Sequence, residues 1–561
     1  MKIYQIRQTL TTGRKSPARK ASESYLFELL PTMKATLSRA GARLKKLPQV
    51  NISEDSVSIP KICGIETEYG IIAKGMEASA VTASSLLINS YVGRFDQTIG
   101  WDFEDEQPGN DARGFSLDDS FPPEIEMHLV NTVLTNGARY YVDHAHPEVS
   151  TPECRTVEEA LIYDRAGEEI VRQSMIAAKG FLPDGAELIA YKNNSDGKGN
   201  SYGCHENYLL ARELPFAKMA ALITTHFVTR QVFCGAGKVG TEFESMPKDS
   251  IAFQLSQRAD FFEEEVGLET TLKRPIVNTR DEPHCDPTKY RRLHVIVGDA
   301  NMSEVATFLK LGTTAILLAM IEDDQLPEDL LLLNPVSAIR QVSHDPTLRQ
   351  AIVLENGKRM TALEIQESLY QYADRYAHKF GLESVGQIVG ENILRRWRQV
   401  IEGLQTDPLS VAHIVDWVAK KRIIDGLVTR HNLRNTDAKL KAVDLQYHDM
   451  RPEKCLALRA GLETLVSPQQ AVDACTAPPE STRAYFRGKC LEIWPNDVVA
   501  ANWDSVVFDI GTGPLKRIPM MEPLRGTKAM TEELFARCLT PADLVAALGD
   551  AVSSSSFKPS N

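Results

Sequence analysis

Three strand-like segments place polar side chains two residues apart, and this alternation constrains the fold more than any other feature of the sequence. They read GIETEYG at 64–70, ARYYVD at 138–143 and RRLHVIVG at 291–298. Residues i and i+2 of a β-strand point to the same face of a sheet. Paired strands of this kind would gather their polar side chains on one face and their apolar side chains on the other.

The shared polar face predicts a site for a cation and phosphate. Its members are carboxylates, guanidinium groups, a phenol and an imidazole: Glu66, Glu68, Arg139, Tyr141, Asp143, Arg292 and His294. Carboxylates with imidazole suit a divalent cation, and this oxygen-rich set favours Mg²⁺ over zinc. Arginine binds phosphate oxygens bidentately. Alternation also arises wherever one sheet face meets water, and a single strand histidine is often a core residue, so both of these readings stay open.

Strand signals gather in the first half of the chain and helical signals follow, which favours the α+β class. Asn136-Gly137 predicts a tight hairpin turn, and 187–192 and 227–234 are further strand-like runs. Apolar residues recur at helical spacing over 303–325 and 410–425. A capping box of Thr361 and Glu364 predicts the start of a helix that ends near Gly381.

Several motifs bear on other chemistries. CGAGKVG at 234–240 contains G-x-G-x-x-G, but 241–250 shows no helical period, so a dinucleotide-binding turn is disfavoured. The chain has no phosphate-binding G-x-x-x-x-G-K-[ST] loop. Cys204 and His205 are neighbours on a predicted strand and point to opposite faces, so Cys204 is interpreted as structural. Trp503 is either a core anchor or a platform on which a base stacks.

Composition sets the expected location and excludes some partners. The formal net charge of −12 argues against nucleic acid as a partner, because neutralising phosphates needs a surplus of Lys and Arg. Nine scattered cysteines without a C-x-x-C pair indicate reduced thiols and a cytoplasmic protein. The longest apolar run, 313–320, is far shorter than a membrane span of about 20 residues, and no signal peptide is recognisable. We therefore expect no membrane association.

Composition shifts divide the 561 residues into four parts. Residues 1–58 are basic and predicted to be a disordered extension, with an arginine-rich targeting arm as the alternative. We expect a catalytic domain over 59–477 and a small C-terminal domain over 478–548, entered through a proline-rich segment. Residues 549–561 are predicted to be a disordered tail.

Ordered sequence blocks resemble a known family. GIETEYG, NGARYYVDHAHPE, YKNNSDGKGNSYGCHENY, VDLQYHDM and TRAYFRGKC resemble the actinobacterial enzymes of the prokaryotic ubiquitin-like protein (Pup) system, which are relatives of glutamine synthetase and the carboxylate-amine ligases. The resemblance runs from about residue 61 to about residue 530. It implies a glutamine-synthetase-like curved antiparallel sheet backed by helices, ATP and Mg²⁺ as cofactors, Pup and pupylated proteins as partners, and a functional link to the proteasome.

The family has a Pup–protein ligase branch and a Pup deamidase/depupylase branch. HAHPE at 144–148 and the insertion at 100–119 resemble the second branch. The implied activity is deamidation of the C-terminal Gln of Pup and hydrolysis of the isopeptide bond between Pup and lysine. Ligation is the alternative activity, and a non-catalytic Pup-binding protein is another.

The resemblance also implies roles for single residues. Asp143 matches the essential aspartate, acting as nucleophile or general base. The implied metal set, in which Glu68 is added because it shares a face with Glu66, is Glu66, Glu68, Tyr141, Glu148, His205 and His294. The implied nucleotide contacts are Arg139, Thr151, Arg292 and Trp503.

Strand geometry adds two expectations about the segment around Asp143. His144, as the next strand residue, should point away from Asp143 and is not expected to be catalytic. Glu148 and Thr151 lie beyond the strand, so they reach the site only if the chain folds back there.

Overall fold

The computed structural model describes residues 56–554 except 96, 105, 118–128, 244–245, 248–249, 272 and 550–551. The predicted disordered extension thus lies outside the described residues, apart from its last three. These are held by hydrogen bonds, because the amides of Val57 and Ser58 each donate to Asp323 Oδ1 at 2.8 Å. Of the predicted tail, 553–554 pair with a strand, and 555–561 lie outside the described residues.

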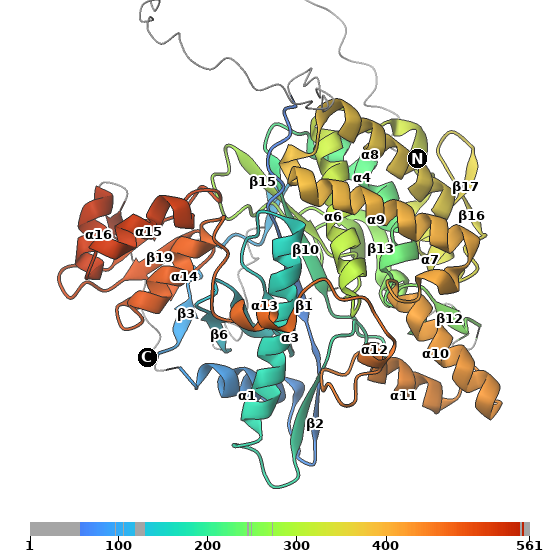
Figure 1. The fold of residues 1–561 in the computed structure, drawn as a ribbon, viewed down its shortest axis with the longest axis horizontal. Helices are drawn as coiled ribbons and strands as arrows, with labels where there is room; N and C mark the ends of the chain where they lie inside the picture. Colours follow the sequence, from blue (N-terminus) through green and yellow to red (C-terminus); the bar gives the residue numbers. More distant parts are fainter. Residues whose placement is uncertain are drawn as a thin grey trace, which may run out of the picture. The chain divides into compact units, whose positions relative to one another are not determined.

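One eleven-stranded sheet runs through the described chain in the order β15-β10-β1-β8-β7-β6-β3-β18-β19-β20-β21. Figure 1 labels six of these strands, β15, β10, β1, β6, β3 and β19. Neighbouring strands are antiparallel except β3 and β18, which are parallel. The strands are β1 (Cys63–Glu68), β3 (Ile99–Trp101), β6 (Asn131–Val133), β7 (Arg139–Asp143), β8 (His146–Ser150), β10 (Cys204–Ala211), β15 (Tyr290–Val295), β18 (Val498–Ala501), β19 (Ser505–Phe508), β20 (Lys516–Pro519) and β21 (Ser553–Ser554).

Short pairs of strands flank this sheet. They are β2 (Gly70–Lys74) with β9 (Glu187–Tyr191), β4 (Asn110–Asp111) with β5 (Phe115–Ser116), β11 (Lys238–Val239) with β12 (Phe253–Gln254), β13 (Phe262–Gly267) with β14 (Arg274–Asn278), and β16 (Ala351–Val353) with β17 (Arg359–Thr361). β9 confirms the strand predicted over 187–192.

Helices pack on the apolar face of the main sheet. α1 (Ala80–Val92) contacts β7 and β8, α3 (Val157–Ala178) contacts β1, and α6 (Glu304–Glu322) contacts β10. Their partners on the sheet are buried apolar residues such as Ile65, Val142 and Leu210. The predicted alternation of apolar and polar faces is therefore real, and it leaves the polar face for the site.

The remaining helices complete the α+β class that the sequence predicts. They are α4 (Phe216–Thr229), α5 (Gln231–Cys234), α7 (Pro335–Ser343), α8 (Ala362–Phe380), α9 (Gln387–Thr406), α10 (Asp416–His431), α11 (Ala438–Tyr447), α12 (Leu456–Arg459), α13 (Pro468–Asp473), α14 (Ala484–Ile493), α15 (Lys528–Arg537) and α16 (Pro541–Leu548). α8 has the predicted capping box of Thr361 and Glu364 and ends at Gly381.

α6 confirms the helix predicted over 303–325. It is long and apolar enough to cross a membrane by length and composition, but the window that passes this test is completely buried inside the protein. Within the described chain α6 is therefore a core helix, packed between α9, α4 and the sheet.

The strand predicted over 227–234 is wrong. These residues end α4 and form α5, and all of them are buried. A helix buried on every side has no polar stripe, so its sequence lacks the period that marks an amphipathic helix. Val and Thr in such a run then mimic a buried strand.

A second hydrophobic cluster lies at the part of the sheet that the C-terminal strands form. It joins Trp101 of β3 to Trp494, Phe508 and Phe535, which come from the segment predicted as a small C-terminal domain. β3 includes residues 100 and 101, so the first residues of the predicted branch-specific insertion (100–119) belong to the sheet. The domain boundaries at 477/478 and 548/549 stay predictions.

Substitution of two helix glycines tests how tightly α6 is packed. Gly312 lies in α6, and Gly426 in α10 serves as the comparison. A Cβ at Gly312 of α6 would lie 2.6 Å from Ile393 of α9, whereas a Cβ at Gly426 of α10 would meet nothing within 4 Å. Replacing Gly426 with Ala should raise the free energy of unfolding by up to about 1 kcal/mol. Gly312→Ala should lower it by about 1–3 kcal/mol, because overpacking outweighs the helix propensity. Urea unfolding of both variants checks this, and equal midpoints would contradict it.

Candidate active site

Strand register brings the predicted carboxylates together. Glu66 lies opposite His205 of β10, and Glu68 lies opposite Glu148 of β8. Glu148 in turn lies opposite Tyr141 of β7. Directly opposed residues of antiparallel strands share a face and have neighbouring Cβ atoms. Residues from four strands therefore converge on the polar face that the sequence predicted.

Two hairpins produce this register. Gly137, with φ of 82°, lies in the predicted turn between β6 and β7. The turn between β7 and β8 consists of only His144 and Ala145, so Asp143 lies opposite His146. The chain thus folds back after Asp143, as the prediction for Glu148 and Thr151 required.

Glu66, His205 and His294 form the first cluster, with ligand-type atoms within 4.8 Å of one another. His205 Nδ1 lies 3.3 Å from Glu66 Oε2, and Asn207 Nδ2 donates to Glu66 Oε1 at 2.8 Å. Burial opposes ionisation of Glu66, but the His205 hydrogen bond and the charges of His294 and Arg292 keep its pKa well below the usual range. An ionised carboxylate beside two imidazoles suits a divalent cation.

Glu68, Asp143 and Glu148 form the second cluster, again with oxygens within 4.8 Å of one another. Burial first, and then the charges of Asp143 and Glu68, raise the pKa of Glu148 well above the usual range. For Glu68 burial acts in the same direction, but the His146 hydrogen bond and the charge of His205 lower its pKa to about 2.

The second cluster has the features of an oxygen-ligand cation site. Glu148 Oε1 is buried and has no hydrogen-bond partner among the described residues. An unpartnered carboxylate oxygen beside two further carboxylates is costly unless a positive charge compensates it. Three carboxylates of this kind suit a hard divalent cation such as Mg²⁺.

Tyr141, predicted as a metal position, lies beside the second cluster. Burial and the neighbouring charge of Glu148 raise the pKa of Tyr141 well above the usual range. The phenol is therefore neutral, and it accepts a hydrogen bond from Ser150 Oγ at 3.4 Å. A neutral phenol in this place can donate a hydrogen bond to the carboxylate of Glu148.

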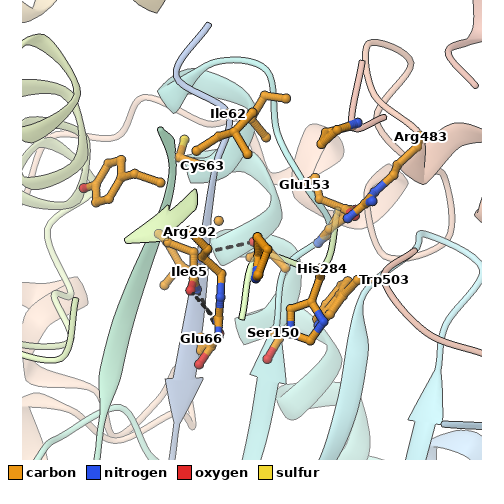
Figure 2. Close-up of a pocket in the computed structure, with 18 residues that line it drawn as sticks. Ile62, Cys63, Ile65, Glu66, Ser150, Glu153, His284, Arg292, Arg483 and Trp503 are labelled. Carbon is orange, nitrogen blue, oxygen red and sulfur yellow. Dashed lines mark hydrogen bonds and ion pairs between the residues drawn. The ribbon is translucent and has the colours of Figure 1, made fainter. Parts of the chain in front are cut away.

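A pocket of about 600 Å³ opens between the start of β1, residues 151–153 and β10 (Figure 2). Its apolar lining residues include Ile62, Leu209 and Pro523. A larger pocket beside it contains Asp143. The residues that line both pockets are Glu66, Ser150, His284, Arg292 and Trp503. An apolar slot thus continues into a polar chamber, which is the arrangement expected for an aromatic base with attached phosphates.

Guanidinium groups line these pockets: Arg292 lines both of them, and Arg139 lines the polar chamber. Arg292 is fixed by donating to the Glu282 carbonyl oxygen at 2.7 Å and to Asn207 Oδ1 at 2.9 Å. Arg139 lies 4.0 Å from the ring centroids of both Trp101 and Tyr141. Preorganised arginines of this kind suit phosphate oxygens.

Thr151 and Trp503, predicted as nucleotide contacts, shape the walls of the slot. Thr151 Oγ1 accepts a hydrogen bond from the Ile65 amide at 3.0 Å. Trp503 packs edge-on against Trp101 at 5.1 Å and also lines both pockets. Both interpretations of Trp503 therefore hold in part, because the side chain is packed against the core and also lines the pocket.

Asn207 and His146 were missed by the sequence analysis. Asn207 contacts Glu66, Arg292 and His294, the last at 3.1 Å. His146 Nδ1 lies 3.4 Å from Glu68 Oε2. Both could have been found from the same alternation, because Asn207 follows His205 by two residues and His146 precedes Glu148 by two.

The expectation that His144 points away from Asp143 is wrong. β7 ends at Asp143, and His144 takes a left-handed conformation with φ of 51°. Its Nδ1 lies 3.0 Å from Asp143 Oδ2. Alternation applies only while the backbone remains extended, and a left-handed turn residue breaks it.

Cys204 is structural, as predicted. It is buried on the face opposite His205, 3.4 Å from Lys310 Nζ, and burial raises the pKa of its thiol. All nine cysteines belong to the described chain, and there each is a buried thiol without a disulfide.

Comparison with known proteins identifies similar chains. A family model described as Pup-ligase protein matches residues 61–507. A depupylase of Acidothermus cellulolyticus is 49% identical, with 87% of this chain and 99% of the relative covered. A Pup deamidase/depupylase of Mycolicibacterium smegmatis is 45% identical, with 86% and 99% covered. A Pup–protein ligase of Nakamurella multipartita is 42% identical, with 72% and 90% covered.

Solved structures match the fold. The complex between Pup and its ligase PafA superposes with a TM-score of 0.71 and 29% identity, covering 87% of this chain and 94% of that chain. PafA in complex with ADP gives a TM-score of 0.67 and 31% identity, covering 75% and 95%. These matches confirm the predicted glutamine-synthetase-like sheet backed by helices.

Glu148 should make stability depend on pH and on cation. A carboxyl group whose pKa is raised in the folded state makes the protein less stable at higher pH. The loss begins as pH rises above the ordinary Glu pKa of about 4.3 and continues until pH reaches the raised folded-state pKa. Chelator-treated protein should therefore lose stability as pH rises. Glu148→Gln should remove part of this loss. Without a cation, its free energy of unfolding near pH 8 should exceed that of the wild type by about 1–3 kcal/mol.

Added Mg²⁺ should make the wild-type protein the more stable of the two. A cation that compensates the carboxylates raises the free energy of unfolding of the wild type more than that of Glu148→Gln. Denaturant unfolding across pH 5–8, with and without Mg²⁺, measures both effects. Parallel pH curves for the two proteins would contradict the raised pKa of Glu148.

Proposed function

Since the chain belongs to the Pup-ligase protein family, we propose that it hydrolyses two bonds of Pup. These are the side-chain amide of a C-terminal Gln and the isopeptide bond between Pup and substrate lysines. Relatives named depupylase and Pup deamidase/depupylase match this chain at 45–49% identity over almost their whole length. The Nakamurella ligase matches less of it, at 42% identity.

The single observation that carries the proposal is the position of Asp143. It is the last residue of β7, lines the open polar chamber, and stands next to Glu68 and Glu148. A substrate amide in this chamber would meet the Asp143 carboxylate at the junction of the strands. The carboxylate either attacks the carbonyl carbon or takes a proton from an attacking water.

ATP and Mg²⁺ belong to the proposal as cofactors. The two carboxylate clusters would hold Mg²⁺, and Arg139 and Arg292 would hold phosphates, with the base in the slot beside Thr151 and Trp503. Bound Mg²⁺ would supply positive charge that offsets the carboxylates and stabilises a developing oxyanion. A similar ligase has been solved with ADP, which supports nucleotide binding by this fold.

The partners follow from the same proposal. Pup is one partner, as in the PafA complex, and pupylated proteins are the other. A functional link to the proteasome and a cytoplasmic location are also proposed. The unpaired, buried cysteines of the described chain support a reducing compartment.

Ligation remains the second candidate, because both solved structures described above are ligases that share this sheet. Incubation with Pup ending in Gln, ATP and Mg²⁺ separates the two activities. Intact-mass spectrometry should show a gain of about one mass unit as Gln becomes Glu, because an amide nitrogen is exchanged for oxygen. Stoichiometric ADP formation with transfer of Pup onto lysine would instead establish ligation.

Asp143→Asn tests the assigned reactive group. An amide is a poor nucleophile and a poor base, so the deamidation rate should fall by at least about 10³-fold. Nucleotide binding, measured by calorimetry in parallel, serves as the folding control. Deamidation at the parent rate would rule out Asp143 and leave a purely binding role for its carboxylate.

Substitution of Trp503 tests whether the apolar slot binds the base of the nucleotide. Trp503→Ala should weaken ATP binding about 5- to 100-fold, since stacking on an aromatic side chain contributes about 1–3 kcal/mol per base. Trp503→Phe keeps an aromatic face and should lose much less. Calorimetric titration with ATP compares them, and equal affinities for the Ala and Phe variants would place the base elsewhere.

A further inference from the structure

The turn between β7 and β8 carries a histidine where glycine or asparagine would be the easier choice. His144 has φ of 51°, in the left-handed region that a side chain with Cβ disfavours. Two-residue turns of this type prefer Asn and Gly at such positions. Histidine is one of the few non-glycine residues found repeatedly in this conformation, so the contact that its side chain makes decides what the turn contributes.

The consequence of this conformation is a contact between sequence neighbours. Side chains of consecutive strand residues point to opposite faces, but here the left-handed turn brings the imidazole back to Asp143. His144 Nδ1 lies 3.0 Å from Asp143 Oδ2. A carboxylate can only accept, so Nδ1 carries the proton and donates. About half of the His144 side chain is exposed, and it lines the same chamber as Asp143.

The surroundings of Asp143 make such a contact useful. Its carboxylate stands within 4.8 Å of those of Glu68 and Glu148, so its rotation is subject to repulsion from one side. Any cation in that cluster would attract the same carboxylate from the same side. A hydrogen-bond donor such as His144 fixes one oxygen and so restrains the rotation of the carboxylate whether the cluster repels it or a cation attracts it.

We propose that His144 is a positioning residue for Asp143, an inference that rests on the proposed hydrolysis of Pup amides. Its Nδ1–H holds Oδ2 and thereby sets the rotation at which the Asp143 carboxylate meets the substrate carbonyl or water. His144 makes no covalent contact with substrate in this role. The left-handed backbone is the structural requirement that allows the hydrogen bond.

Two substitutions separate the hydrogen bond from the turn. Both Gly and Asn accept a φ near 51°, so neither should disturb the hairpin. His144→Gly removes the donor, whereas His144→Asn keeps an N–H donor on a short side chain. Deamidation of Pup ending in Gln, with saturating ATP and Mg²⁺, gives kcat and KM for each variant.

We expect kcat of His144→Gly to fall about 10- to 100-fold with KM for Pup within about twofold of wild type, because a misplaced reactive group loses rate rather than affinity. His144→Asn should recover kcat to within about fivefold of wild type, because it restores the donor. Asn432→Gly is the matched control, since Asn432 is also left-handed, with φ of 49°, and ends α10. Its kcat and KM should be unchanged.

Three results would overturn the inference: full kcat in His144→Gly, equal kcat losses in the Gly and Asn variants, or a rise in KM that accounts for the loss. The failure of the proposed function looks different. If wild-type protein does not deamidate Pup at all, the hydrolase assignment fails. If wild type deamidates Pup and His144→Gly equals it, only the positioning role fails.

Discussion

The register of four strands, β10-β1-β8-β7, is the constraint on which the rest of the site depends. It places Glu66 opposite His205 and stacks Glu68, Glu148 and Tyr141 across adjacent strands. A shift of one residue in any of these pairings would send the carboxylates to the helical core. The apolar residues between them, packed on α1, α3 and α6, oppose that shift because they would become exposed.

Repulsion among the clustered carboxylates destabilises the fold, and this energetic cost indicates that the cluster is retained for function. A fold selected only for stability would not bury Glu148 beside Asp143 and Glu68 with an oxygen left unpartnered. The first cluster compensates its charge from within the protein, since His205, Asn207 and Arg292 surround Glu66. In the second cluster His146 and His144 lie beside Glu68 and Asp143, but Glu148 Oε1 has no partner among the described residues. A cation would stabilise this oxygen most.

The two pockets differ in chemistry, and in the proposed function they separate nucleotide binding from the reaction. The apolar slot contains Arg292 and Trp503 (Figure 2). The polar chamber shares these two residues and reaches Asp143. Asn207 connects the two by contacting both Glu66 and Arg292. Binding of phosphate at Arg292 would therefore affect Glu66 of the first carboxylate cluster through the side-chain amide of Asn207.

The amino-acid sequence alone was sufficient to predict the polar face and the strands that carry it. Alternation identified Glu66, Glu68, Arg139, Tyr141, Asp143, Arg292 and His294, and the same period would have supplied Asn207 and His146. The division of these residues into two clusters required the three-dimensional fold, because it depends on which strands pair and in what register. The fold also decided that 227–234 is helical, since complete burial erases the helical period. It decided the contact of His144 with Asp143 as well, because a single left-handed residue ends the alternation on which strand-based reasoning relies.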